Sequence, residues 1–146
     1  MTKQTLPRIT QVYLCDNAFQ DTRNKWNLIG IFTGDVVVEK FPARLRAALY
    51  VEIELQESIG VVLELFLGRK LVATINATVE SLDGVESGLG VLAIPGMEFG
   101  VDKTSEFRVV GRIDQLPKRT VFKRKILSRP DVASSPTLSG GLPSDL

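Results

Sequence analysis

Residues 44–55 read RLRAALYVEIEL, and every odd-numbered position in this stretch is apolar. The even-numbered positions carry arginine, alanine, tyrosine and glutamate. Successive side chains of a β-strand point to opposite faces of the sheet, so this alternation predicts a strand with one buried face. Because residues 44–56 would form an unusually long strand, we expect a bend or a bulge within it.

The same alternation recurs along the chain and predicts an all-β protein. Further strands are expected at residues 9–15, 26–33, 35–39, 61–67, 71–79, 89–99, 107–113 and 120–127. The turn Gly68-Arg69-Lys70 predicts an antiparallel hairpin in which the odd-numbered residues of 61–67 and 71–79 face inward. Pro95-Gly96 predicts an edge, a bulge or a turn, because proline cannot donate to a sheet. About eight strands predict a two-sheet antiparallel β-sandwich, immunoglobulin-like or C2-like.

Two segments lack this alternation. The polar residues 16–25 are expected to form a loop with room for one helical turn. Residues 128–146 are rich in serine, proline and glycine, so they cannot bury enough apolar surface to offset the entropy of ordering. The sequence therefore predicts one β-sandwich domain over residues 1–127 and a disordered tail over residues 128–146.

Composition removes several classes of function. The chain has no histidine, which excludes a Ser-His-Asp triad, a Cys-His pair and histidine-ligated metal sites within it. Its formal net charge of +1 argues against a nucleic-acid partner, because such binders are usually plainly basic. The single cysteine excludes an internal disulfide and favours the reducing cytoplasm. We expect no secretory signal, because residues 1–10 contain neither an apolar h-region nor a small-residue cleavage site. We also expect no membrane span, because no apolar run approaches about 20 residues.

The segment Leu14-Cys15-Asp16 is followed ten residues later by Trp26-Asn27-Leu28-Ile29-Gly30-Ile31-Phe32, and Pro42 then precedes the long strand. This order resembles a family of short uncharacterised bacterial all-β proteins, a domain of unknown function, over about residues 9–113. The resemblance implies a small β-sandwich, cytoplasmic or phage-associated, with no assigned activity. It supplies no functional residues, and the basic segment 118–125 departs from the family's pattern.

Cys15 is the one thiol of the chain, and it stands next to Asp16. A reactive cysteine needs a neighbouring positive group to lower its pKa, and an adjacent carboxylate has the opposite effect. A buried cysteine otherwise behaves as a small apolar side chain. We therefore predict a structural role for Cys15.

Asp16, Asn17 and Asp21 lie close together in the sequence. Loop carboxylates of C2-like sandwiches bind calcium, because hard cations take oxygen ligands. Such a site would also need the acids of later loops, which are Asp83, Glu86 and Asp102. The same residue types cap turns through backbone hydrogen bonds, and we favour that role. The sequence predicts no catalytic residue, metal ion or cofactor.

One segment carries a local imbalance of charge, because residues 115–127 hold no acid. Its basic residues are Lys118, Arg119, Lys123, Arg124 and Lys125. We favour protection of an exposed edge strand, which lysine and arginine keep from pairing with another molecule. The alternatives are a contact with an anion or an acidic partner surface, and a short basic amphipathic helix. Phe122 is the only aromatic residue of the segment, which argues against stacking on single-stranded nucleic acid.

Four apolar residues fall on the expected outward faces of their strands: Val62, Phe66, Val72 and Val110. Single exposed apolar side chains are common, but several on neighbouring strands form a patch, and patches mark interfaces. We therefore hypothesise a homodimer that forms through this sheet face, and the alternative is that the tail or a loop covers these residues.

These observations favour a non-catalytic binding or scaffolding module, with a protein as its partner. Function in such folds lies in sites grafted onto the fold rather than in the fold itself. The alternative is a phage or particle-associated structural component that assembles through sheet edges or faces. A further alternative is a carboxylate- or metal-dependent enzyme, which would need a concave pocket with perturbed carboxylates.

Overall fold

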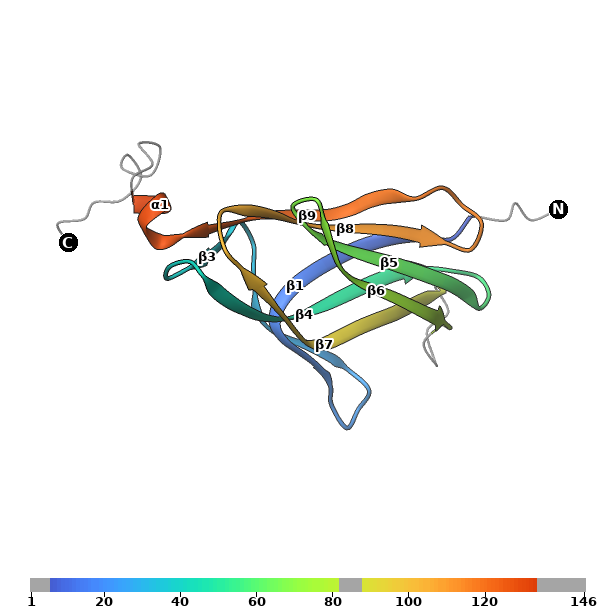
Figure 1. The fold of residues 1–146 in the computed structure, drawn as a ribbon. Coiled ribbons are helices and arrows are strands. Elements are labelled where there is room, and N and C mark those ends of the chain that lie inside the picture. The colour runs from blue at the N-terminus through green and yellow to red at the C-terminus, as the bar shows by residue number, and fades with distance from the viewer. Residues whose placement is uncertain (1–5, 82–87, 134–146) are drawn as a thin grey trace.

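The computed structural model describes residues 6–81 and 88–133, and within them the chain forms nine strands and one short helix (Figure 1). The elements are β1 (Arg8–Gln20), β2 (Trp26–Ile31), β3 (Val36–Val38), β4 (Ala43–Glu54), β5 (Ile59–Leu67), β6 (Lys70–Val79), β7 (Leu89–Val101), β8 (Ser105–Ile113), β9 (Arg119–Ser128) and α1 (Arg129–Ala133). No helix in these ranges is long and apolar enough to cross a membrane.

The strands form two sheets that pack face to face. Sheet A has the order β2-β1-β4-β7, and sheet B has the order β3-β9-β8-β5-β6. All the strand pairs are antiparallel except β3 with β9, which run parallel. The predicted all-β, two-sheet sandwich is therefore confirmed.

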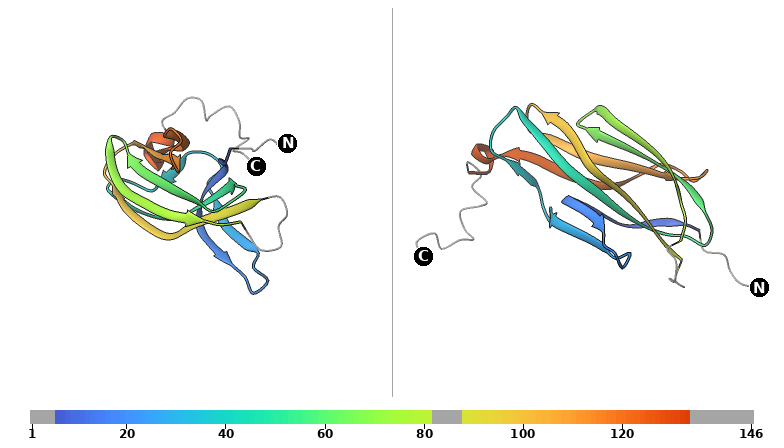
Figure 2. Two further views of the ribbon diagram at one scale, coloured as in Figure 1. Left: turned by 90° about the vertical axis from the view of Figure 1, so that its right-hand side faces the viewer. Right: turned by 90° about the horizontal axis from the view of Figure 1, so that it is seen from below.

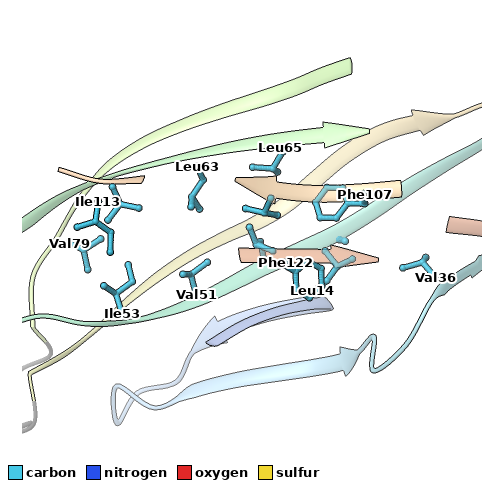
Figure 3. Close-up of a cluster of buried hydrophobic side chains, with 14 of the residues drawn as sticks. Leu14, Val36, Val51, Ile53, Leu63, Leu65, Val79, Phe107, Ile113 and Phe122 are labelled. Atoms are coloured by element: carbon cyan, nitrogen blue, oxygen red, sulfur yellow. The ribbon is translucent and has the colours of Figure 1, made fainter. Parts of the chain in front are cut away.

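The core lies between the sheets, where the alternation of the sequence places it (Figure 3). The odd-numbered residues of β4 from Leu45 to Ile53 are at most 7% exposed. They face the inward side chains of sheet B, among which Leu63, Leu65 and Phe107 are essentially buried. Phe107 stacks on Phe99, with ring centroids 5.4 Å apart. The two sheets therefore pack together because alternate residues of their strands are apolar and point toward the opposite sheet.

The bulge expected within residues 44–56 lies instead in the neighbouring strand β7. Ala47 lies opposite Met97, but Leu49 lies opposite Ile94, so β7 holds one residue more than β4 over this interval. The extra residue falls at Pro95-Gly96, and Gly96 adopts a positive φ of 65°. The proline therefore lies at a bulge and on the outermost strand of sheet A, where a missing amide donor costs least.

The β5–β6 hairpin is confirmed, but the expected alternation fails at its turn-proximal end. Leu65 lies opposite Ala73, whereas Phe66 lies opposite Leu71, so Val72 is an extra residue in β6. The bulge turns Val72 against the core and leaves Leu71 45% exposed. Outward placement of Val72 and inward placement of Leu71 were therefore wrong, because one inserted residue exchanges the two faces of a strand.

The segment expected to be a loop after the first strand is mostly strand. β1 continues to Gln20, pairs with β2 as far as Trp26, and leaves only residues 21–25 for the turn. The Asp21 carboxylate holds this turn by accepting hydrogen bonds from the Arg23 and Lys25 amides at 2.8 and 3.0 Å. Those two hydrogen bonds lower the pKa of Asp21 below its usual value, with the Lys25 amide making the larger contribution. The turn role predicted for this acid fits the geometry.

Residues 128–133, which the composition assigned to a disordered tail, are ordered in the structure. Ser128 completes β9 and is buried, and its hydroxyl oxygen accepts a hydrogen bond from the Asp131 amide at 3.3 Å. The Arg129 guanidinium binds the Glu39 carboxylate through two nitrogens at 2.9–3.2 Å. The serine N-cap and the two-nitrogen ion pair are polar contacts that place α1 in a segment with few apolar side chains to bury. Residues 134–146 lie outside the described ranges.

Candidate interaction surface

β1 pairs with a different strand in each of its two parts. Its residues Arg8–Cys15 pair with β4, and its residues Cys15–Gln20 pair with β2. The second part of β1 and the whole of β2 therefore form a two-stranded extension, which we call the ribbon. Figures 1 and 2 show the turn of the ribbon projecting away from the body of the sandwich.

The inner face of the ribbon is anchored on the outside of sheet A. The Trp26 ring meets the Tyr50 ring edge to face, with centroids 5.8 Å apart. Leu28 packs against a small buried cluster formed by Cys15, Ala18 and Ala48. These contacts hold the ribbon in a fixed direction, because aromatic pairs and close packing of small residues are both directional.

Gly30 lies where the ribbon departs from sheet A and has a positive φ of 67°. An added Cβ at this position would overlap the Asp16 carboxylate. Glycine therefore permits both the backbone conformation and the close approach of the two strands.

The outer face of the ribbon is apolar and exposed. Phe19, Ile29 and Ile31 are 42%, 52% and 41% exposed, and their strand partners are Asn27, Asn17 and Cys15. β2 is an outermost strand of sheet A, and its sequence WNLIGI has no charged side chain. An uncharged edge strand with large apolar side chains is a surface that another chain can cover.

Sequence analysis did not identify this surface. Its signal lies in residues 28–32, LIGIF, which are apolar without alternation. A strand that is apolar on both faces needs a packing partner against each face. In this structure one face covers Cys15 and Ala48, while the other has no cover within the described residues. Phe19 was missed because its segment was assigned to a loop.

The five basic residues of the C-terminal segment do not form one patch. Lys118 and Arg119 lie at the end where β8 turns into β9, and the Lys118 ammonium pairs with the Glu64 carboxylate at 3.0 Å. Farther along β9, the Arg124 guanidinium lies 4.4 Å from the Phe122 ring centroid. Lys123 and Lys125 are exposed on the opposite face.

β9 pairs with β3 only from Ile126 to Ser128, so its residues 119–125 have a free edge within the described chain. Arg119, Lys123, Arg124 and Lys125 therefore lie on a strand that is paired with β8 on one side and has no partner strand on the other. This position suits the protective role that we favoured for these residues.

The outward residues proposed for a dimer face are only half-buried or covered. Val62, Phe66 and Val110 are each intermediate in exposure, and the Arg108 guanidinium lies 4.6 Å above the Phe66 ring. Val110 lies opposite Glu64 on the neighbouring strand. Charged side chains thus interrupt this face, which makes it a weaker apolar surface than the outer face of the ribbon.

The Cys15 side chain is fully buried beneath the ribbon. Its thiol donates a weak hydrogen bond to the Ala48 carbonyl oxygen, with the sulfur 3.6 Å away. Burial raises the pKa of this thiol, and the neighbouring Asp16 carboxylate raises it further. The thiolate, which is the nucleophilic form, is therefore suppressed near neutral pH.

We expect the thiol-specific reagent DTNB to modify Cys15 slowly in the native protein at pH 8 and rapidly in denaturant. The reason is that both access and ionisation require the ribbon to leave its position. Equal rates in the two states would show that the ribbon is not packed over Cys15.

The candidate calcium ligands are dispersed. Asp16 lies on β1, Asp21 in the ribbon turn and Asp102 in the turn between β7 and β8, while Asp83 and Glu86 lie outside the described residues. No group of three or more His, Cys, Asp or Glu side chains in the described ranges is placed to hold a metal ion. Among these acids, Asp21 accepts hydrogen bonds from backbone amides of its own turn.

No protein-family model, curated protein or solved structure matches the chain.

Proposed function

We propose that the chain is a non-catalytic protein-binding module whose partner covers the outer face of the ribbon. One observation carries this proposal: Phe19, Ile29 and Ile31 are exposed side by side on a projecting strand pair whose edge has no charge. The single, buried and protonated cysteine suits the reducing cytoplasm, which is where we place this activity.

The expected mode of binding is the addition of a partner strand to β2. The free edge of β2 offers a row of backbone groups for hydrogen bonds, and the apolar side chains beside it give specificity. Each of the three side chains is about half exposed, so its complete burial contributes about 1 kcal/mol of apolar transfer free energy. Such a contact is large enough to hold a partner and small enough to leave the free module soluble.

The test is native mass spectrometry of the tagged full chain, purified gently from its own host. We compare the wild type with Ile29→Glu, which puts a charge on the ribbon, and with Leu71→Glu as a matched control on β6. Leu71 is 45% exposed and lies outside the ribbon, so both variants change surface residues. We expect neither variant to change stability by more than about 0.5 kcal/mol.

A partner that comes with the wild type and with Leu71→Glu, but falls at least about tenfold with Ile29→Glu, supports the proposal. Equal recovery with all three chains places the binding surface elsewhere. Recovery of the wild type as a lone monomer contradicts the proposal.

A particle-associated structural component remains the second candidate, and one observation favours it. Besides β2, the strand β6 is also an outermost strand, and its residues 71–79 carry no charged side chain. Two uncharged edges in different sheets allow one chain to contact two others, which leads to open-ended assembly. A concentration-dependent series of homo-oligomers beyond the dimer in the same spectra favours this candidate.

A further inference from the structure

A cavity of about 320 Å³ opens at the end of the sandwich opposite α1. It lies between the start of β1 and the β8–β9 turn, which come together at the same end of the molecule in Figure 1. Its walls are mostly apolar and include Ile9, Leu116 and Val121. A volume of this size is at the lower end of the range for small-molecule sites.

The cavity exists because the sandwich is open along this side. Residues 8–14 of β1 pair with β4 alone, and residues 119–125 of β9 pair with β8 alone. Gly111 of β8 lines the cavity between these two edges. An added Cβ at Gly111 would lie 2.8 Å from Ile9 Cδ1 and 3.4 Å from Val121 Cγ1, so the glycine lets these two side chains pack directly against the backbone of β8 at the wall of the cavity.

The mouth of the cavity carries one positive charge in excess. Its three cations are Arg8, Lys118 and Arg119. Arg8 pairs with Glu54 at 3.4 Å and Lys118 pairs with Glu64 at 3.0 Å. Arg119 makes no ion pair or side-chain hydrogen bond with any described residue. A guanidinium in this position is suited to a carboxylate, which it can bind through two nitrogens.

An exposed leucine borders the same opening. Leu6 is 68% exposed, more than any other large apolar side chain in the described ranges. A ligand with an apolar body would cover it and extend the apolar wall, whereas a fully polar ligand would leave it in water.

We propose that this cavity binds a small amphipathic monocarboxylate, with its headgroup on Arg119 and its unbranched chain between Ile9, Leu116 and Val121. The single excess charge suits a monoanion better than a phosphate or a dicarboxylate. The cavity of about 320 Å³ leaves room for a small ligand, such as a chain of about eight carbons with its carboxylate. This site is separate from the ribbon, and the proposal stands whether or not the ribbon binds a protein.

Isothermal titration of the full chain with sodium octanoate tests the proposal, with 1-octanol as the uncharged probe. We expect saturable 1:1 binding of octanoate and binding of octanol that is weaker by about tenfold or more. Arg119→Ala should weaken octanoate by a similar factor and leave octanol unchanged. Arg112→Ala, an exposed arginine on the same strand as Gly111, is the matched control and should change neither.

Gly111→Ala tests the apolar floor independently of charge. The added methyl group reaches the end of the flexible Ile9 side chain, so the fold should adjust while the cavity becomes smaller. We expect both octanoate and octanol to weaken together. The absence of saturable octanoate binding, equal affinity for octanol, or an equal loss in Arg112→Ala would each overturn the proposal.

Discussion

Replacing Phe107 by alanine is expected to lower the free energy of unfolding by about 3–5 kcal/mol. Phe107 is fully buried in the middle of the core, where it stacks on Phe99 and meets Phe122 edge to face at 6.4 Å. Both sheets contribute to this contact, so the cavity left by the ring cannot close without moving one sheet against the other. Urea denaturation followed by tryptophan fluorescence measures the loss.

Phe66→Ala is the matched control for this prediction. The Phe66 ring is half-buried on the outer face of sheet B and leaves little void when it is removed. We expect its loss to be about 1 kcal/mol, since mainly surface contacts disappear. Equal losses for the two variants would contradict the packing of the core around Phe107.

Gly88→Ala is expected to cost about 2–4 kcal/mol, although it adds only one methyl group. Gly88 has a positive φ of 67°, and an added Cβ would overlap the Leu55 carbonyl oxygen. Relief would move the backbone and break the hydrogen bond from the Leu55 amide to the Gly88 carbonyl oxygen, which is 2.7 Å long.

The control for this glycine is Gly100→Ala in β7. A Cβ at Gly100 would have no heavy atom within 4 Å, and its φ is not in the left-handed region. We therefore expect Gly100→Ala to change stability by no more than about 0.5 kcal/mol in thermal or urea unfolding. A Gly88→Ala variant as stable as Gly100→Ala would show that the approach of Gly88 to Leu55 is not required.

The sandwich could be predicted from the sequence because most of the core strands alternate apolar and polar residues with a period of two. In β4 the odd-numbered residues from Leu45 to Ile53 are apolar and buried, as the pattern predicts. Ala48 and Tyr50 on the opposite face are buried as well, because the ribbon packs over that face. The hairpin around Gly68 was predictable for the same reason. In these strands the alternation of the sequence and the burial of side chains in the fold indicate the same structure.

The errors arose where a feature depends on a contact between distant residues. The bulge at Val72 adds one residue to β6 and exchanges its faces, and nothing in residues 70–79 marks it. The helix α1 contacts the rest of the chain through an ion pair between Arg129 and Glu39, which lie 90 positions apart in the sequence, and through a hydrogen bond from Thr104 to Asp131. Such long-range polar contacts leave no periodic signal, so composition alone predicted disorder.

The candidate sites were predictable only in part, for the same reason. Lys118 and Arg119 were singled out from their charge, but their separation from Lys123 depends on where β9 enters sheet B. The outer face of the ribbon carries a signal in residues 28–32, yet its exposure depends on β1 extending past Asp16. A surface that forms where two strands leave the body of a sheet can be located only once it is known which strands pair with each other.

Site-specific photocrosslinking in the native host tests the central claim most directly. A photoreactive amino acid replaces Ile29 in one chain and Leu71 in another, because both side chains are exposed on outermost strands. If the ribbon is the binding surface, position 29 should crosslink to one defined protein and position 71 should give little of that product. The same product in equal yield from both positions, or none from position 29, would contradict the account.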